Sequence, residues 1–267
     1  MSVTTFSPSS KPIGVHFDAV SRRFEDGVTA LDSVSFTVQP GELSVLVGPS
    51  GCGKTTALRM IGGLDQPNSG AVTLHSAQSV SDFVERSPGL IGYCFQEPRL
   101  LPWRTVLENV CLPFELGANV HADGADAARD ALEKVGLLDA LSKRPHELSG
   151  GMRMRVAIAR ALVTQPRLLL LDEPFGALDE ISRARLDDVL LELWSRIGVT
   201  IVMVTHSLAE AVYLGQTVHI LSPSPGRLAQ TMEVRFESRT PETRLTPEFA
   251  KYVATAHSAL KDGEAHK

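Results

Sequence analysis

A glycine-rich segment of the chain carries the residue types that bind phosphate. Gly48 and Gly53 are separated by four residues, and Lys54 and Thr55 follow directly. Small residues let successive backbone amides converge on phosphate oxygens, and a helix that begins there favours an anion at its N-terminus. The lysine is placed to reach the β- and γ-phosphates of a nucleoside triphosphate such as ATP, and the threonine can ligate Mg²⁺. We assign phosphate binding to this loop, with contacts from Gly48, Ser50, Gly51, Gly53, Lys54, Thr55 and Thr56.

Two adjacent carboxylates follow a continuous apolar run at residues 168–171. At the carboxyl end of a buried strand, Asp172 can hold Mg²⁺ through water, and Glu173 can polarise an attacking water as a general base. Alone, the pair could be solvated charges at the end of a strand. Beside a phosphate-binding loop, it predicts a site that hydrolyses a nucleoside triphosphate.

The elements that must position these residues alternate along the chain. Apolar runs at 43–47, 168–171 and 201–204 predict buried strands of a parallel sheet. The phosphate-binding loop lies between the first of these strands and a helix, and this context argues against a chance glycine-rich turn. Shorter β-like runs stand at 15–17, 34–38, 71–74 and 92–95.

Residues from about 97 to 165 change character and predict helices. Thr105 and Glu108 fit a capping box, in which each side chain satisfies a free amide of the first helical turn. Further helical stretches are expected at 122–138 and 149–163. The tail predicts short strands and turns, then a helix at about 247–260. Alternating strands and helices imply an α/β fold, with this helical subdomain inserted near its middle.

Composition excludes several classes of protein. The chain has 267 residues, of which 43% are hydrophobic, and no apolar run approaches the length of a membrane-spanning helix. The net charge of −5 argues against a dedicated nucleic-acid binder. Three cysteines without metal spacing fit a reducing compartment. The first residues lack the apolar core of a secretory signal, so we expect a flexible tail at 1–13 and a cytoplasmic protein.

A third glycine-containing segment, Leu148-Ser149-Gly150-Gly151, precedes a long helix, and Arg153 and the run 156–162 follow it. With the two motifs above, it resembles the signature of the nucleotide-binding subunits of ABC transporters. The resemblance covers about residues 14–235, which we take as one ABC ATPase domain. It implies a parallel-sheet core, an antiparallel β subdomain and the helical subdomain at about 97–165. Residues 236–267 would form a C-terminal extension.

The resemblance implies a head-to-tail homodimer that encloses two ATP molecules. In the family, the signature residues of one subunit, here Ser149, Gly150 and Gly151, meet the γ-phosphate held by the other subunit. Physically, these residues begin a helix whose positive end points outward, where one chain alone has no phosphate to bind.

Four further residues resemble family positions. Gln96, which ends a strand, resembles the glutamine that senses Mg²⁺ and the attacking water. Asp179 resembles the aspartate of a loop that crosses between subunits. His206 resembles the histidine that contacts the γ-phosphate. Phe24 is placed like the aromatic residue that stacks on adenine, although a hydrophobic core position is the alternative.

Two signature positions depart from the common pattern. Met152 stands where many relatives have glutamine, which we read as a slight change in nucleotide contact and not as loss of function. Met154 stands where glutamine is common two residues later. Glu173 is retained, so the resemblance implies an active ATPase.

Cys52 lies inside the phosphate-binding loop, where it is either a redox-sensitive position or simply a small residue that fits.

The segment from Gln96 to Val106 resembles the importer subfamily for nitrate, aliphatic sulfonates, taurine and related small anions. In that subfamily, Leu100, Leu101 and Trp103 would dock the permease, although core packing of the helical subdomain is the alternative. The implied partners are membrane permease subunits and, through them, a solute-binding protein. The chain would then lie peripherally on the cytoplasmic face of the inner membrane.

Two other functions remain open at this point. The chain could serve another ABC transport system, such as an exporter or a signalling complex. It could also be a soluble ABC ATPase that acts on nucleic acid or the ribosome. Against the soluble alternative, the chain has one cassette, no long coiled coil between its motifs and an acidic balance.

Overall fold

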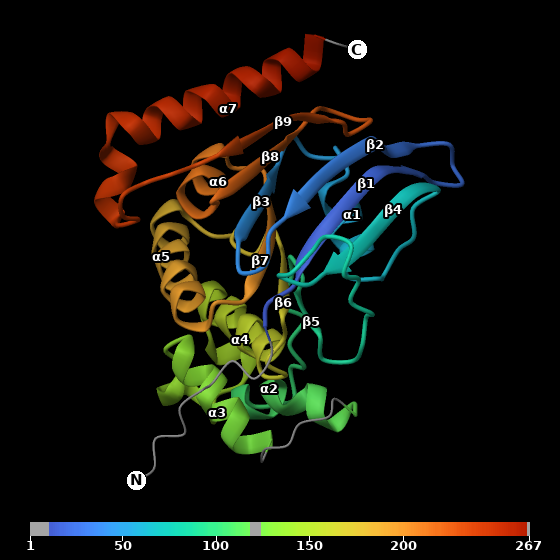
Figure 1. Cartoon of the computed structure of the whole chain (residues 1–267). Coiled ribbons are helices and arrows are strands. Elements are labelled where there is room, and N and C mark those ends of the chain that lie inside the picture. Colours follow the sequence, from blue (N-terminus) through green and yellow to red (C-terminus); the bar gives the residue numbers. More distant parts are fainter. Residues whose placement is uncertain (1–10, 118–123, 266–267) are drawn as a thin grey trace.

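The computed structural model describes residues 11–117 and 124–265 of the chain. A six-stranded sheet forms its centre, in the order β5-β6-β7-β3-β8-β9 (Figure 1). Neighbouring strands are parallel except β8 and β9, which are antiparallel. The parallel core that the apolar runs predicted is therefore confirmed. The strands are β3 (Leu43–Val47), β5 (Ile91–Cys94), β6 (Leu168–Asp172), β7 (Thr200–Thr205), β8 (Thr217–Leu221) and β9 (Leu228–Glu233).

A second, antiparallel sheet has the order β2-β1-β4. It consists of β1 (Gly14–Arg23), β2 (Thr29–Val38) and β4 (Ser69–His75). Helix α1 (Lys54–Ile61) shares one hydrophobic cluster with this sheet and with one face of the large sheet. The antiparallel β subdomain is thereby confirmed, and it holds the start of α1 between two sheets.

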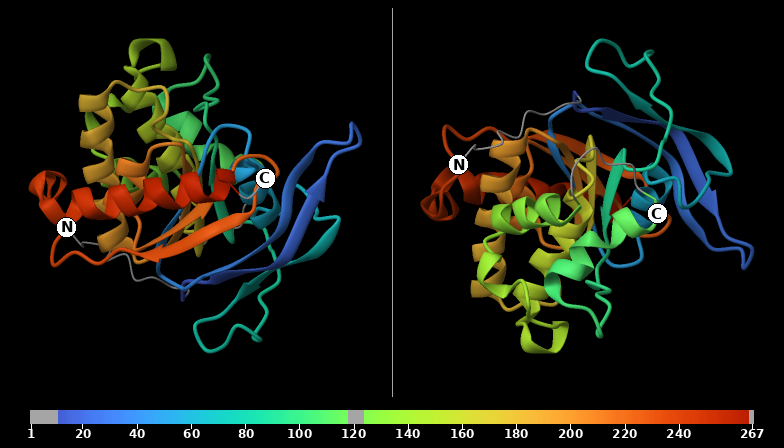
Figure 2. Two further views of the ribbon diagram at one scale, coloured as in Figure 1. Left: turned by 90° about the horizontal axis from the view of Figure 1, so that it is seen from above. Right: turned by 90° about the horizontal axis from the view of Figure 1, so that it is seen from below.

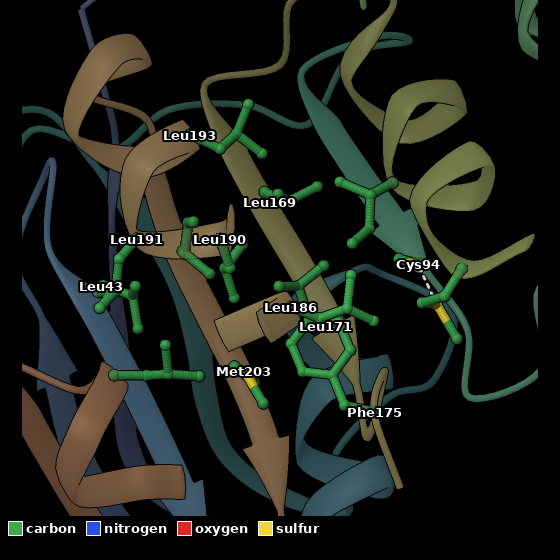
Figure 3. Packing of buried hydrophobic residues seen from close by; sticks show 14 of the residues in the cluster. Leu43, Cys94, Leu169, Leu171, Phe175, Leu186, Leu190, Leu191, Leu193 and Met203 are labelled. Atoms are coloured by element: carbon green, nitrogen blue, oxygen red, sulfur yellow. Dashed lines mark hydrogen bonds between the residues drawn. The ribbon is translucent and has the colours of Figure 1, made fainter. Parts of the chain in front are cut away.

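Alternating side chains along β6 divide the hydrophobic core into two clusters. Leu168 and Leu170 pack with α1 and the antiparallel sheet. Leu169 and Leu171 point to the opposite face and pack against helix α5 (Glu180–Ile197), as Figure 3 shows. Both faces of a parallel strand are covered in this way, which explains why the strand sequence is continuously apolar.

The helical subdomain and the antiparallel sheet lie on different sides of the large sheet (Figure 2). Its helices are α2 (Val106–Glu115), α3 (Gly124–Lys134) and α4 (Gly150–Leu162). The predicted capping box is present, because Thr105 Oγ1 accepts from the Glu108 amide and the Glu108 carboxylate accepts from the Thr105 amide. Part of the stretch predicted as helical at 122–138 lies outside the described residues.

Two helices and a short 3₁₀ turn complete the chain. Helix α6 (Leu208–Leu214) follows β7, and the turn Pro241–Leu245 leads into α7 (Pro247–Ala265). Helix α7 lies over β8 and β9 (Figure 1) and runs five residues beyond the predicted end at 260. No helix in the described part of the chain is both long and apolar enough to cross a membrane.

The start of the chain differs in part from the expected tail at 1–13. Residues 1–10 of that tail lie outside the described residues. Ile13, however, is fully buried in the cluster beneath the antiparallel sheet. Packing of the chain thus begins at least one residue before the domain boundary expected at Gly14.

Candidate functional site

Four neighbouring parallel strands end at the same edge of the large sheet, and each is followed by residues that the sequence predicted to be functional. Strand β3 leads into the glycine-rich loop, and β6 ends at Asp172 and leads into Glu173. Gln96 lies two residues after β5, and His206 directly follows β7. Because these strands are adjacent, the segments that follow them meet in one place.

The glycine-rich loop wraps around the lysine that begins α1. Lys54 is buried, and its Nζ donates to the carbonyl oxygens of Gly48 at 2.8 Å and Pro49 at 2.9 Å. Gly53 has a φ of +91°, and a Cβ there would lie 2.6 Å from the Ala30 carbonyl oxygen, so only glycine fits. A Cβ on Gly51 would meet no atom within 4 Å, which marks the open side of the loop. The loop therefore surrounds a space that phosphate could enter.

The two predicted Mg²⁺ ligands next to the loop are in direct contact. Thr55 Oγ1 donates to Asp172 Oδ1 at 2.8 Å, and the Tyr93 hydroxyl donates to the other carboxylate oxygen at 3.3 Å. Burial raises the pKa of Asp172, and the hydrogen bonds from the two hydroxyls oppose that shift. A hydroxyl and a carboxylate held together in this way offer the oxygen ligands that Mg²⁺ prefers.

Glu173 lies between the loop lysine and His206. Its Oε1 is 3.8 Å from Lys54 Nζ, and its Oε2 is 2.9 Å from His206 Nδ1. The backbone of Glu173 has a φ of +44°, a left-handed conformation that costs free energy for a residue with a side chain. The surrounding chain thus holds the predicted general base in a strained position at the mouth of the site.

A pocket of about 350 Å³ joins these residues to the antiparallel sheet. Phe24, which lines the pocket, is partly exposed, and the Arg22 guanidinium lies 4.9 Å from its ring centroid. An aromatic ring and a phosphate-binding loop that line the same pocket suit a nucleotide. The lining residues are Phe24, Val28, Ala30, Ser50, Gly51, Gly53, Lys54, Thr55, Thr56, Gln96 and Glu173.

The signature residues do not line this pocket in the described structure. Ser149 caps α4 by accepting from the Met152 amide at 3.3 Å. A Cβ on Gly150 would lie 3.2 Å from Leu178, the residue before Asp179. Asp179 itself caps α5 by accepting from the Ser182 amide. The residues predicted to act across a dimer, including Gly151, therefore lie outside the nucleotide pocket of their own chain.

Several contacts of the site were not predicted from sequence. Tyr93 was missed, although it lies on a strand that pairs with β6 and could have been found from that register. Val28 and Ala30 were missed because no motif marks them. Arg183 donates to the carbonyl oxygens of Phe175 and Leu178 and so holds the chain that follows Glu173.

Cys52 is fully buried within the loop, and burial raises the pKa of its thiol. A Cβ on Gly48 would lie only 2.8 Å from Cys52 Sγ. Close packing and a raised pKa both disfavour the reactive thiolate. The geometry thus fits the simpler of the two interpretations, in which a small residue fills the space.

Fold and pocket together define a P-loop nucleotide hydrolase with a helical insertion, and comparison with known proteins narrows this class. Residues 31–176 match the family described as ABC transporter. The aliphatic sulfonates import ATP-binding protein SsuB of Bacillus subtilis (strain 168) is 41% identical over 83% of each chain. The nitrate import ATP-binding protein NrtD of Synechocystis sp. is 37% identical over 90% of this chain and 91% of its own.

A solved structure has the same architecture. The dimeric, post-hydrolysis ATP-binding cassette MJ0796, bound to ADP and Pi, has a TM-score of 0.68 and 31% identity to this chain. The match covers 83% of this chain and 99% of that one. This chain belongs to the ABC transporter family, and it is an ATP-binding subunit that hydrolyses ATP.

Proposed function

We propose that this chain is the ATP-hydrolysing motor subunit of an importer that takes up a small anionic solute such as nitrate, a sulfonate or taurine. The pocket lined by Lys54, Thr55 and Glu173, in which Thr55 is bonded to Asp172, carries the motor assignment. The similarity to sulfonate and nitrate import subunits supports the class of solute.

ATP and Mg²⁺ would be held by groups that the fold already brings together. Thr55, Asp172 and Gln96 would ligate Mg²⁺, since the first two are in contact and the third lines the same pocket. Bound Mg²⁺ would offset the negative charge of the phosphates. Lys54 now bonds to two carbonyl oxygens of its own loop, and it would exchange these bonds for phosphate oxygens.

Glu173 and His206 would act on the water that attacks the γ-phosphate. Glu173 accepts a proton from that water as general base. His206, 2.9 Å from Glu173, orients the carboxylate and lies exposed at the pocket mouth, where it can reach the γ-phosphate. Phe24 would stack on the adenine at the far end of the pocket.

A second copy of the chain would complete each site. The exposed start of α4, with Ser149, Gly150 and Gly151, has a positive end suited to the γ-phosphate bound by the partner. Asp179 would lie at the same interface. ATP-driven closure of two copies and reopening after hydrolysis would then move the permease between its outward-open and inward-open states.

The permease would dock beside Gln96, at the junction of the helical subdomain and the large sheet. Trp103 is 68% exposed and Leu116 is 77% exposed, and Leu116 lines a groove of about 460 Å³ next to β5. Leu100 and Leu101 are only partly exposed, and Leu100 packs against the core. We therefore assign docking to Trp103 and Leu116, and packing to Leu100.

Co-purification from membranes tests the proposal. The tagged full chain carrying Glu173→Gln is used as bait in detergent-solubilised membranes with ATP, and the eluate is identified by mass spectrometry. We expect a permease, and a solute-binding protein associated with it, which would place the chain peripherally on the cytoplasmic face of the inner membrane.

A matched pair of surface variants sharpens this experiment. Trp103→Ser in the bait should lose the permease, whereas Phe83→Ser should keep it, because Phe83 is 67% exposed but lies on the antiparallel subdomain. An exporter in the eluate would favour another ABC transport system. An eluate without a permease, together with stimulation of the wild-type chain's ATP hydrolysis by double-stranded DNA, would overturn the proposal in favour of a soluble ABC ATPase.

A further inference from the structure

The C-terminal extension, from residue 236 onward, binds the end of the helix that follows His206. Arg239 donates to the carbonyl oxygens of Val212, Tyr213 and Gly215, at distances of 2.6 to 3.0 Å, and to Val234 at 2.9 Å. The first three carbonyls belong to the last turn of α6 and its end. A guanidinium there satisfies carbonyls that the helix leaves free and complements the negative end of its dipole.

Arg244 joins the same helix to α5. Its guanidinium donates to Asp187 at 3.0 Å and to Asp188 at 3.1 Å, both on α5. It also lies 3.3 Å from the ring centroid of Tyr213 on α6, and the Tyr213 hydroxyl donates to Asp188 at 2.6 Å. One side chain of the extension therefore ties α5 and α6 together.

Two buried carboxyl groups lie at this junction. Asp187 on α5 and Glu210 on α6 are 3% and 6% exposed. In the described structure, Asp187 Oδ1 and Glu210 Oε1 are buried without a hydrogen-bond partner. Burial, and then the negative charge of Glu210, raise the pKa of Asp187 to about 8, and burial also raises the pKa of Glu210. The two groups repel each other whenever both are ionised.

A positively charged side chain faces each of these two carboxyl groups, Arg244 for Asp187 and Arg183 for Glu210. Arg244 faces Asp187 from the extension, and Asp188 adds a negative charge from α5. The groups that face Glu210 are Arg183 on α5, His206, Glu173 and the Thr205 hydroxyl. Arg244 is thus the positive charge that the extension brings to Asp187.

Glu210 is also tied to the catalytic histidine. It lies four residues after His206, and its amide donates to the Ser207 hydroxyl that caps α6. A shift of Glu210 would therefore move the start of α6, where His206 contacts Glu173. No residue beyond 235 lines the nucleotide pocket in the described part of the chain, so such a shift would act at a distance.

We propose that Arg244 is a positioning residue for ATP hydrolysis: by binding Asp187 and Asp188 on α5 and stacking on Tyr213 of α6, it fixes the helix that presents His206 to Glu173. This inference rests on the proposed roles of Glu173 and His206. Removing the guanidinium leaves Asp187 opposite Glu210 with less to balance it, and the helix start loosens. We expect ATP binding to be unaffected, because no residue of this junction lines the nucleotide pocket.

The pH dependence follows from the direction of the Asp187 shift. Its pKa in the fold is about 8, above the ordinary value of 3.8, so the protonated form is favoured. The stability that this proton contributes is complete below about pH 4 and is lost as the pH rises through about 8. Without Arg244, which lowers this pKa, the value rises further, and burial, Glu210 and Asp188 all oppose ionisation at alkaline pH.

Steady-state ATP hydrolysis by the full chain, measured as kcat and KM across pH, tests the proposal. We expect Arg244→Gln to lower kcat about threefold near pH 7 and about tenfold near pH 9, with KM for ATP within about twofold. Adding Asp187→Asn should remove the pH-dependent part of the loss, because the repelling charge is gone. Arg235→Gln, at a position 84% exposed and paired with Glu233, should match the wild type.

The outcomes separate this inference from the proposed function. A wild-type chain that does not hydrolyse ATP would overturn both. A wild type that hydrolyses ATP, with Arg244→Gln equal to it, overturns the role of Arg244 alone. A loss in Arg244→Gln that is constant with pH and is not relieved by Asp187→Asn would also overturn it, since general destabilisation would explain that pattern. If Arg244→Gln folds poorly, as judged by circular dichroism, the double variant still decides the question.

Discussion

Two glycine-containing turns begin helices in this molecule, and they are built differently. The turn before α1 encloses Lys54, and Glu173, which follows β6, lies beside it. No side chain caps α1, because its N-cap residue is Gly53. The turn before α4 is capped by the Ser149 hydroxyl and lies beside Leu178, away from the pocket.

The difference indicates which part of nucleotide binding each turn can perform. The start of α1 has free amides, a cation and two carboxylates assembled in one chain, which is sufficient to bind a triphosphate. The start of α4 has the same helix polarity but no catalytic group beside it. A site built from both turns therefore needs two copies of the chain, each supplying one of them.

The strongest test of the first turn is Glu173→Gln. The amide cannot accept the proton of the attacking water, so we expect kcat to fall about 10³-fold. The shape of the pocket and the loop lysine are kept, so ATP should still bind and should trap a dimer. Hydrolysis is followed by phosphate release, and dimerisation by size-exclusion chromatography with ATP.

Glu192→Gln is the matched control for this variant, because Glu192 is an exposed acid on α5 paired with Arg196. It should hydrolyse ATP as the wild type does. Hydrolysis by Glu173→Gln at the wild-type rate would show that the general base lies elsewhere.

The second turn is tested by Gly151→Asp. An aspartate near the start of α4 is favourable to the helix itself, so folding should be kept. It would oppose the γ-phosphate of the partner subunit, and we expect kcat to fall about 10²-fold with the ATP affinity of the isolated chain unchanged.

Gly151→Ala, which adds bulk but no charge at the same place, should lose far less activity. ATP affinity is measured by titration at concentrations where the chain is monomeric. If Gly151→Asp weakens ATP binding by the monomer, the second turn belongs to the same chain's pocket and the comparison fails.

Regions whose contacts join residues close together in the sequence were easier to predict than regions held by distant contacts. The loop around Lys54, the capping box at Thr105 and the strand before Asp172 are set by neighbours in the chain, and the structure has each of them. The contact of Tyr93 with Asp172 joins positions 79 residues apart, and it depends on strand register that no local pattern gives.

An irregular backbone made the full length of strand β1 unpredictable from the sequence. Strand β1 was expected only at 15–17, but it continues to Arg23. Its register shifts between Phe17 and Val20, where Ala19 has a φ of +45°, so the alternation of apolar and polar residues breaks. The pairing of Arg244 with Asp187 was hidden for another reason, since it joins two helical regions through side chains alone.

Lys54→Ala measures how much of the first turn's affinity comes from charge. The lysine is buried and surrounded by its own loop, so alanine removes the cation and leaves the backbone amides. We expect ATP affinity to fall about tenfold or more, a loss of roughly 1.4 kcal/mol per decade. Titration with a fluorescent ATP analogue checks this, and Lys143→Ala, at an exposed position, is the control. Unchanged affinity would remove the lysine from the binding site.

Ser149→Ala gives the smallest effect and separates the two turns most directly. Loss of the hydroxyl leaves the Met152 amide without its cap, which should lower the free energy of unfolding by about 1 kcal/mol. ATP affinity of the monomer should not change, because α1 uses no such cap and, in the proposed function, binds the nucleotide without the start of α4. Ser149→Asp, which restores a capping oxygen, should recover the stability in chemical denaturation. A stability loss that Ser149→Asp fails to recover would mean that the hydroxyl does not act as a cap, and that α4 is held by packing against Leu178 instead.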